Sequence, residues 1–147
     1  MNKSESPKDS SPENKKDSTA PKYSEEELSA IFDEIIFSGE YAEDFKIKGK
    51  LPVTLRTRTA EEIDKIQHHL DASGSNLIAT IESIRSLMHL QYAIVKYKGE
   101  DLSVYKIEEK AGFINKLPGP IVAALINTLA KFDEKVAMAC KEGEVNF

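Results

Sequence analysis

Residues 45–58, FKIKGKLPVTLRTR, decide the fold because apolar residues occupy every second position on both sides of Gly49-Lys50. A period of two is typical of half-buried β-strands. The Gly49-Lys50 pair between the two runs indicates a hairpin turn. We therefore expect a β-hairpin over residues 44–58. Pro52 cannot donate a ladder hydrogen bond, so we expect it at the edge of a sheet.

On both sides of this hairpin, apolar residues recur at helical spacing. Two capping boxes mark where helices begin, one made by Ser24 with Glu27 and the other by Thr59 with Glu62. Gly39 stands where a helix C-terminal glycine belongs. The predicted helices span residues 24–37, 60–71, 77–97, 108–117 and 120–140.

The helix predicted over residues 77–97 is the most apolar segment, and its wide apolar stripe is typical of a core helix. A two-stranded hairpin is marginal in water by itself, so it has to pack on helices or pair with something else. The fold class expected is α+β and mainly helical. Four to five helices would surround the central apolar helix, with one β-hairpin at the edge.

Residues 1–23 differ from the rest of the 147-residue chain. They hold five Ser, five Lys and three of the six Pro, and they contain no Ile, Leu, Val or Phe. Such a segment buries too little apolar surface to offset its ordering entropy. We expect residues 1–23 to be a disordered tail and residues 24–147 to form a single domain.

The composition also restricts the class of protein. We expect no membrane span, since no apolar run approaches the roughly 20 residues that one needs, and no secretion signal. The single cysteine allows no internal disulfide and suits a reducing compartment. A net charge of −5 argues against general nucleic-acid binding.

The residues capable of catalysis or metal binding are few. Asp64 and His68 have i,i+4 spacing and could supply two ligands, but a zinc site takes three or four. We expect His89 to be partly buried and Cys140 to be a buried or half-buried thiol. Neither GxGxxG nor GxxxxGK[ST] occurs. The sequence therefore predicts no catalytic, cofactor or metal site, and no enzyme.

Basic residues are concentrated on the predicted hairpin. Lys46, Lys48, Arg56 and Arg58 would project from one of its faces. Three interpretations stay open: a solvated face that protects an exposed edge from aggregation, a docking surface for an acidic protein, or a nucleic-acid contact. We predict these four residues as the protein-binding residues.

Residues 45–62, FKIKGKLPVTLRTRTAEE, resemble an element of tail assembly chaperones and small baseplate or tail morphogenesis proteins of tailed bacteriophages. In those families an extended stretch ends in an Arg-Ser/Thr pair, and a Thr- or Ser-capped acidic helix follows. Here the pair is Arg56-Thr57, followed by Thr59, Glu61 and Glu62. The resemblance implies a protein without catalytic residues that binds virion components during tail or baseplate assembly.

We therefore expect a protein-binding virion morphogenesis factor, either an assembly chaperone or a minor structural component. Its partners would be other proteins, phage tail or baseplate components, with a homo-oligomer as a further possibility. It would work in the host cytoplasm during assembly, and a structural component would stay in the virion. The alternative is a nucleic-acid-associated regulator that binds through the basic hairpin face. An enzyme of unrecognised type is the third hypothesis.

Overall fold

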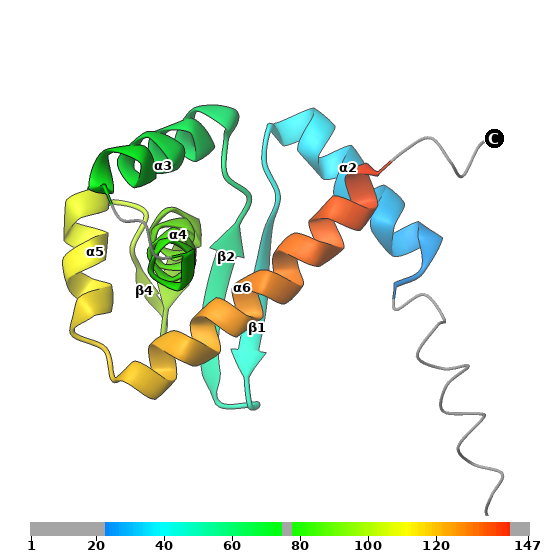
Figure 1. Ribbon diagram of the computed structural model, residues 1–147. Coiled ribbons are helices and arrows are strands. Elements are labelled where there is room, and N and C mark those ends of the chain that lie inside the picture. Colours follow the sequence, from blue (N-terminus) through cyan, green and yellow to red (C-terminus); the bar gives the residue numbers. More distant parts are fainter. Residues whose placement is uncertain (1–22, 75–77, 142–147) are drawn as a thin grey trace, which may run out of the picture.

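The structure is a computed structural model, and it describes residues 23–74 and 78–141. Within these ranges five helices accompany a four-stranded antiparallel sheet with strand order β1-β2-β3-β4 (Figure 1). The prediction of a mainly helical α+β fold is confirmed. The disordered tail predicted for residues 1–23 lies outside the described residues except for Tyr23. The start of the helix predicted at residue 77 and the end of the predicted domain at 142–147 also lie outside them.

Helix α2 spans Glu25–Ser38 and has the predicted caps at both ends. The Ser24 hydroxyl accepts a hydrogen bond from the Glu27 N–H at 3.0 Å. Gly39 follows the helix with a φ of 82°, in the left-handed region that glycine adopts without steric cost. The capping box is only half formed, because the Glu27 carboxylate instead forms an ion pair with Lys135 at 3.0 Å.

Strands β1 (Ala42–Ile47) and β2 (Leu51–Arg56) form the predicted hairpin, with Ile47 opposite Leu51. In the turn, both Lys48 (φ 56°) and Gly49 (φ 68°) have positive φ. The expectation that Pro52 lies in an edge strand is wrong, because β2 is paired on both sides. Pro52 lies where the ladder with β3 ends, and its carbonyl oxygen accepts from the Lys98 N–H at 2.9 Å, so the missing N–H removes only the reciprocal bond of that terminal pair.

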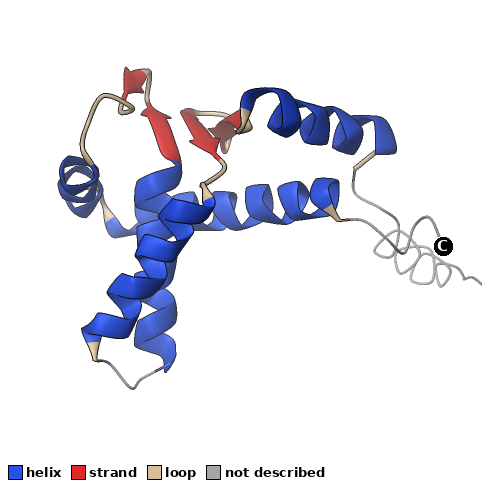
Figure 2. Cartoon of the chain, turned by 90° about the horizontal axis from the view of Figure 1, so that it is seen from above, coloured by secondary structure: helices blue, strands red, loops and turns tan. Residues whose placement is uncertain are grey.

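Helices α3 (Ala60–Ser73) and α4 (Ile78–Ala93) pack side by side and project from the sheet as a pair (Figure 2). The capping box of α3 is complete. Thr59 Oγ1 accepts from the Glu62 N–H at 3.1 Å, and Glu62 Oε1 accepts from the Thr59 N–H at 2.9 Å. The second predicted box is therefore confirmed.

A second hairpin, β3 (Ile94–Tyr97) with β4 (Glu100–Asp101), replaces the end of the helix predicted over residues 77–97. The chain turns at Lys98 and Gly99, which have φ of 53° and 84°. β3 pairs with β2, so the expected lone hairpin is part of a larger sheet. The Nζ of Lys110 in α5 (Ile107–Asn115) donates to the Ile94 carbonyl oxygen at 2.8 Å, and burial lowers the pKa of Lys110.

Helix α6 (Gly119–Cys140) crosses one face of the sheet (Figures 1 and 2). Its Phe132 is 1% exposed and lies between two aromatic rings of the first hairpin region. The ring of Tyr41 stacks on Phe132, and Phe45 meets it edge-on, both with centroids 5.9 Å apart. The core that these contacts extend includes Val53, Leu55, Leu90, Ala93, Ile94, Leu102, Ile114, Leu125 and Leu129.

Part of the apolar stripe predicted for α2 faces solvent. Ile31 is buried, whereas Phe32, Ile36 and Phe37 are 41%, 63% and 88% exposed. Ile31 faces inward while Phe32 and Ile36 lie farther round the helix, because successive residues turn by about 100°. Helical spacing predicted the helix, but it does not place all of the apolar residues of α2 in the core.

Candidate protein-binding site

Strand β1 has a free edge within the described sheet, because only β2 pairs with it. The Thr57 N–H donates to the Tyr41 carbonyl oxygen at 2.9 Å. This hydrogen bond fixes the register, so the backbone N–H and C=O groups of the odd-numbered residues of β1 point toward β2. In an antiparallel ladder the backbone groups of alternate residues point in opposite directions. The backbone N–H groups of Ala42, Asp44 and Lys46 therefore point away from the sheet.

A groove of about 420 Å³ lies between this edge and α6. Its walls combine apolar side chains with polar and basic ones. They come from β1 and its turn, namely Phe45, Lys46, Ile47 and Lys48, and from α6, namely Ala124, Asn127, Thr128 and Lys131. The four α6 residues recur at helical spacing, so they form one face beside the buried stripe of that helix. The lining contains no carboxylate.

Three lysines surround the groove: Lys46, Lys48 and Lys131, which we call the lysine triad. All three are exposed. Among residues 23–74 and 78–141, no carboxylate lies within ion-pair distance of any of these ammonium groups. Three unpaired positive charges therefore gather at one edge of a chain whose net charge is −5.

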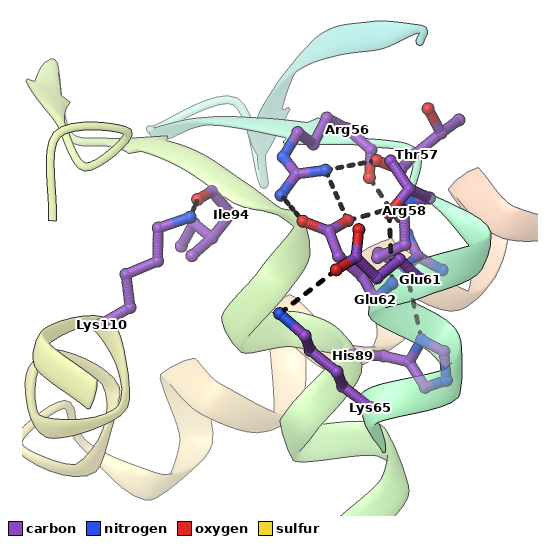
Figure 3. A network of polar contacts seen from close by, with 10 residues as sticks. Arg56, Thr57, Arg58, Glu61, Glu62, Lys65, His89, Ile94 and Lys110 are labelled. Carbon is purple, nitrogen blue, oxygen red and sulfur yellow. Dashed lines mark hydrogen bonds and ion pairs between the residues drawn. The ribbon is translucent and has the colours of Figure 1, made fainter. Parts of the chain in front are cut away.

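Arg56 was predicted to join this basic face, but its guanidinium is engaged inside the molecule. It forms a two-pronged ion pair with Glu62, with Nη1–Oε1 at 3.0 Å and Nη2–Oε2 at 2.8 Å (Figure 3). Its Nη1 also donates to the Thr57 carbonyl oxygen at 2.8 Å. The hydrogen bonds to Glu62 raise the pKa of Arg56. Because Glu62 also caps α3, the pair fixes how that helix leaves β2.

Arg58 does not project from the hairpin face either, since its side chain is only 7% exposed. Its Nη2 donates to Asp133 Oδ2 at 2.6 Å, and its Nε donates to His89 Nδ1 at 3.3 Å. Burial, and then the Arg58 charge, lower the pKa of His89. The prediction that all four basic residues share one solvated face is therefore wrong. Lys46 and Lys48 remain at the site, and Arg56 and Arg58 are structural.

The sequence alone did not identify Lys131 as a residue of the site. The available signal was the helical spacing of Ala124, Asn127, Thr128 and Lys131, which form a row beside the apolar stripe of α6. Nothing local in the sequence showed that this stripe would face β1. Only the packing of α6 across the sheet brings Lys131 to the two hairpin lysines.

The other chemically interesting residues do not assemble into a site. Among the described residues, no group of three or more His, Cys, Asp or Glu is placed to hold a metal ion. His68 is exposed, and its Nδ1 lies 2.9 Å from the Asp64 carbonyl oxygen. His89 is half-buried, as expected. Cys140 is exposed, so the expectation of a buried or half-buried thiol is wrong.

Comparisons of this chain with protein-family models, with curated proteins and with solved structures gave no match. None of the described helices is both long enough and apolar enough to cross a bilayer.

Proposed function

We propose that this protein is a non-catalytic assembly factor that binds an acidic protein partner in the groove beside β1. The observation that carries this proposal is the lysine triad: in the described part of the chain, three ammonium groups without carboxylate partners lie beside an apolar groove and an open strand edge. An apolar groove with a charged rim is typical of protein-binding sites, in which the charges select the partner.

The biological setting that we propose is the assembly of a bacteriophage tail or baseplate. It is supported by the resemblance of residues 45–62 to phage tail morphogenesis proteins. In this chain the same residues form the first hairpin and the capped start of α3. The partner would be a tail or baseplate protein. A departing chaperone would be absent from finished particles, and a minor structural component would be present in them.

The nucleic-acid hypothesis has lost part of its basis. Two of its four proposed cations, Arg56 and Arg58, form internal ion pairs with Glu62 and Asp133. Specific nucleic-acid surfaces commonly combine phosphate-binding cations with aromatic or helix-borne groups that read the bases. None of the residues lining the groove except Phe45 is aromatic, and Phe45 packs edge-on against Phe132.

The test is affinity capture from the native source with the full-length protein, followed by mass spectrometry. A K46E/K48E/K131E variant reverses the lysine triad, and K116E is the matched control because Lys116 is exposed at the end of α5, away from the groove. We expect the wild type and K116E to capture tail or baseplate proteins, and the triple variant to lose them. A search for the protein in purified particles then separates chaperone from component.

Two results would contradict the proposal. One is capture of the same partners by the triple variant at wild-type yield, which would place binding elsewhere on the surface. The other is selective recovery of nucleic acid by the wild type but not by the triple variant, which would make the triad a phosphate-binding site.

A further inference from the structure

We infer that the partner binds as an extended segment that adds a fifth strand to the sheet beside β1. This inference rests on the proposed function and specifies its mode of binding. Strand addition needs an edge whose backbone groups are open and a neighbouring surface that can accept alternate side chains. The β1 edge satisfies both conditions.

The open part of the edge is the half of β1 nearest the hairpin turn. Helix α2 ends at Ser38, shortly before β1 begins at Ala42, so it lies beside that end of the strand (Figure 1). The other half offers the N–H and C=O groups of Asp44 and the N–H of Lys46. The Lys46 carbonyl is used in the turn, where it accepts from the Gly49 N–H at 3.0 Å.

Side chains of an added strand would alternate between the two faces of the sheet. On the α6 side they would enter the groove and contact Phe45, Ile47 and Ala124, which favours apolar residues. On the opposite face they would lie near Lys46, which favours carboxylates. Asp44 is on that same face, where it accepts a hydrogen bond from the Thr54 hydroxyl at 2.7 Å.

Charge therefore also fixes where the acidic residues of the partner lie. Asp44 would repel a carboxylate beside it, whereas Lys46 and Lys48 lie at the turn end of β1. The best ligand is a segment in which acidic and apolar residues alternate, with its carboxylates toward Lys46 and Lys48. We assign this segment to another protein chain.

The chain itself contains one sequence of related composition, residues 142–147, EGEVNF. The same segment from a second copy is the competing occupant, and the experiment has to distinguish it.

The experiment measures the binding of a labelled peptide of about eight alternating Glu and Val residues, a typical strand length, to the full-length protein. The charge-reversed Lys-Val peptide is its control. D44P removes the outward N–H of Asp44 and leaves the β1–β2 ladder intact, because that N–H does not face β2. D44A is the matched control, since it also removes the carboxylate but keeps the N–H.

We expect the Glu-Val peptide to bind and the Lys-Val peptide to bind at least about tenfold more weakly. D44P should weaken Glu-Val binding at least about tenfold, whereas D44A should bind as tightly as the wild type or more tightly. Residue-resolved amide hydrogen exchange tests the same binding mode in the wild-type protein, without any substitution. The amides of Asp44 and Lys46 should exchange more slowly once the peptide is bound.

Strand addition is overturned if the wild type does not bind the Glu-Val peptide, if D44P binds it as well as D44A does, or if the two amides gain no protection. Capture of tail proteins that still depends on the lysine triad would then leave the proposed function intact. The assignment to another protein is overturned if a peptide of residues 141–147 binds more tightly than Glu-Val and the wild type forms dimers that D44P disperses.

Discussion

Arg58 and Asp133 are 75 residues apart in the sequence, yet Arg58 Nη2 lies 2.6 Å from Asp133 Oδ2. This contact joins the segment after β2 to the middle of α6. Lys131 precedes Asp133 by two residues on that helix, so the ion pair helps to hold one wall of the groove against the sheet.

Removing the acid of this pair should destabilise the protein. D133A would leave the guanidinium of Arg58, which is only 7% exposed, without its carboxylate. Because the Asp133 side chain is itself 40% exposed, we expect a loss of about 1–3 kcal/mol in the free energy of unfolding, measured by urea denaturation. E134A removes the neighbouring exposed carboxylate and should change stability by less than about 0.5 kcal/mol. Equal losses in both variants would show that the ion pair contributes nothing specific.

Lys135 should be a second stabilising residue. Its Nζ lies 3.0 Å from both Glu27 and Glu43, so it joins α2, β1 and α6. Burial opposes the charge, but hydrogen bonds to the two carboxylates outweigh this effect and raise the pKa of Lys135. K135M leaves both carboxylates unpaired and should cost about 2–3 kcal/mol in urea denaturation.

K131M is the control for K135M, because Lys131 lies on the same helix but is exposed. It should leave the free energy of unfolding within about 0.5 kcal/mol of the wild type. K131M should nevertheless weaken partner binding, whereas any K135M that remains folded should still bind. A large loss of stability in K131M would mean that the groove lysines are structural.

His89 and His68 should affect the pH dependence of stability in opposite directions. Burial and the Arg58 charge lower the pKa of His89, so the unfolded state takes up its proton first and stability falls as the pH drops below about 6.5. A hydrogen bond to the Asp64 carbonyl raises the pKa of His68. His68 therefore stabilises the folded state fully at pH values below its pKa in the unfolded chain. This stabilisation is lost as the pH rises through its pKa in the folded protein.

Urea denaturation at several pH values between about 5.5 and 7.5 tests both histidines. H89Q should reduce the loss of stability on acidification, and H68Q should increase it. Parallel pH profiles for the wild type and H89Q would contradict the role assigned to burial of His89.

The two hairpin turns allow a test that separates stability from binding. Lys48 and Lys98 both have positive φ, which asparagine tolerates better than lysine does. K48N and K98N should each raise the free energy of unfolding by about 0.5 kcal/mol, measured by thermal or urea denaturation. Only K48N should weaken binding, because Lys98 is not part of the groove. If K98N weakened binding equally, the groove would be the wrong site.

Local signals in the sequence predicted much of the fold. The Thr59–Glu62 capping box, the cap at Ser24 and the alternation around Gly49 act over a few residues, and each appears where it was expected. The strand β3 was missed because its apolar residues continue the pattern of the preceding helix, and a short apolar run fits either structure. The β-branched pair Ile94-Val95 before the Lys98-Gly99 turn was the available signal.

The candidate site was only half predictable, for a different physical reason. Lys46 and Lys48 follow from strand alternation and the turn. Whether Arg56 and Arg58 stay in solvent depends on carboxylates that α3 and α6 bring to them. Lys131 likewise reaches the groove only through the packing of α6. Long-range contacts of this kind leave no periodic pattern in the sequence.

Because lysines lie along the free edge of β1, we expect added salt to have opposite effects on two kinds of association: binding of an acidic partner and pairing of two copies. An acidic partner is attracted to them, so added salt should weaken that complex by screening the charges. Two copies meeting edge to edge would bring their Lys46 and Lys48 side chains together, and this repulsion keeps the bare edges apart. The same salt would relieve that repulsion. We therefore expect low ionic strength to favour binding of the proposed acidic segment at this edge, and high ionic strength to favour edge-to-edge association between copies.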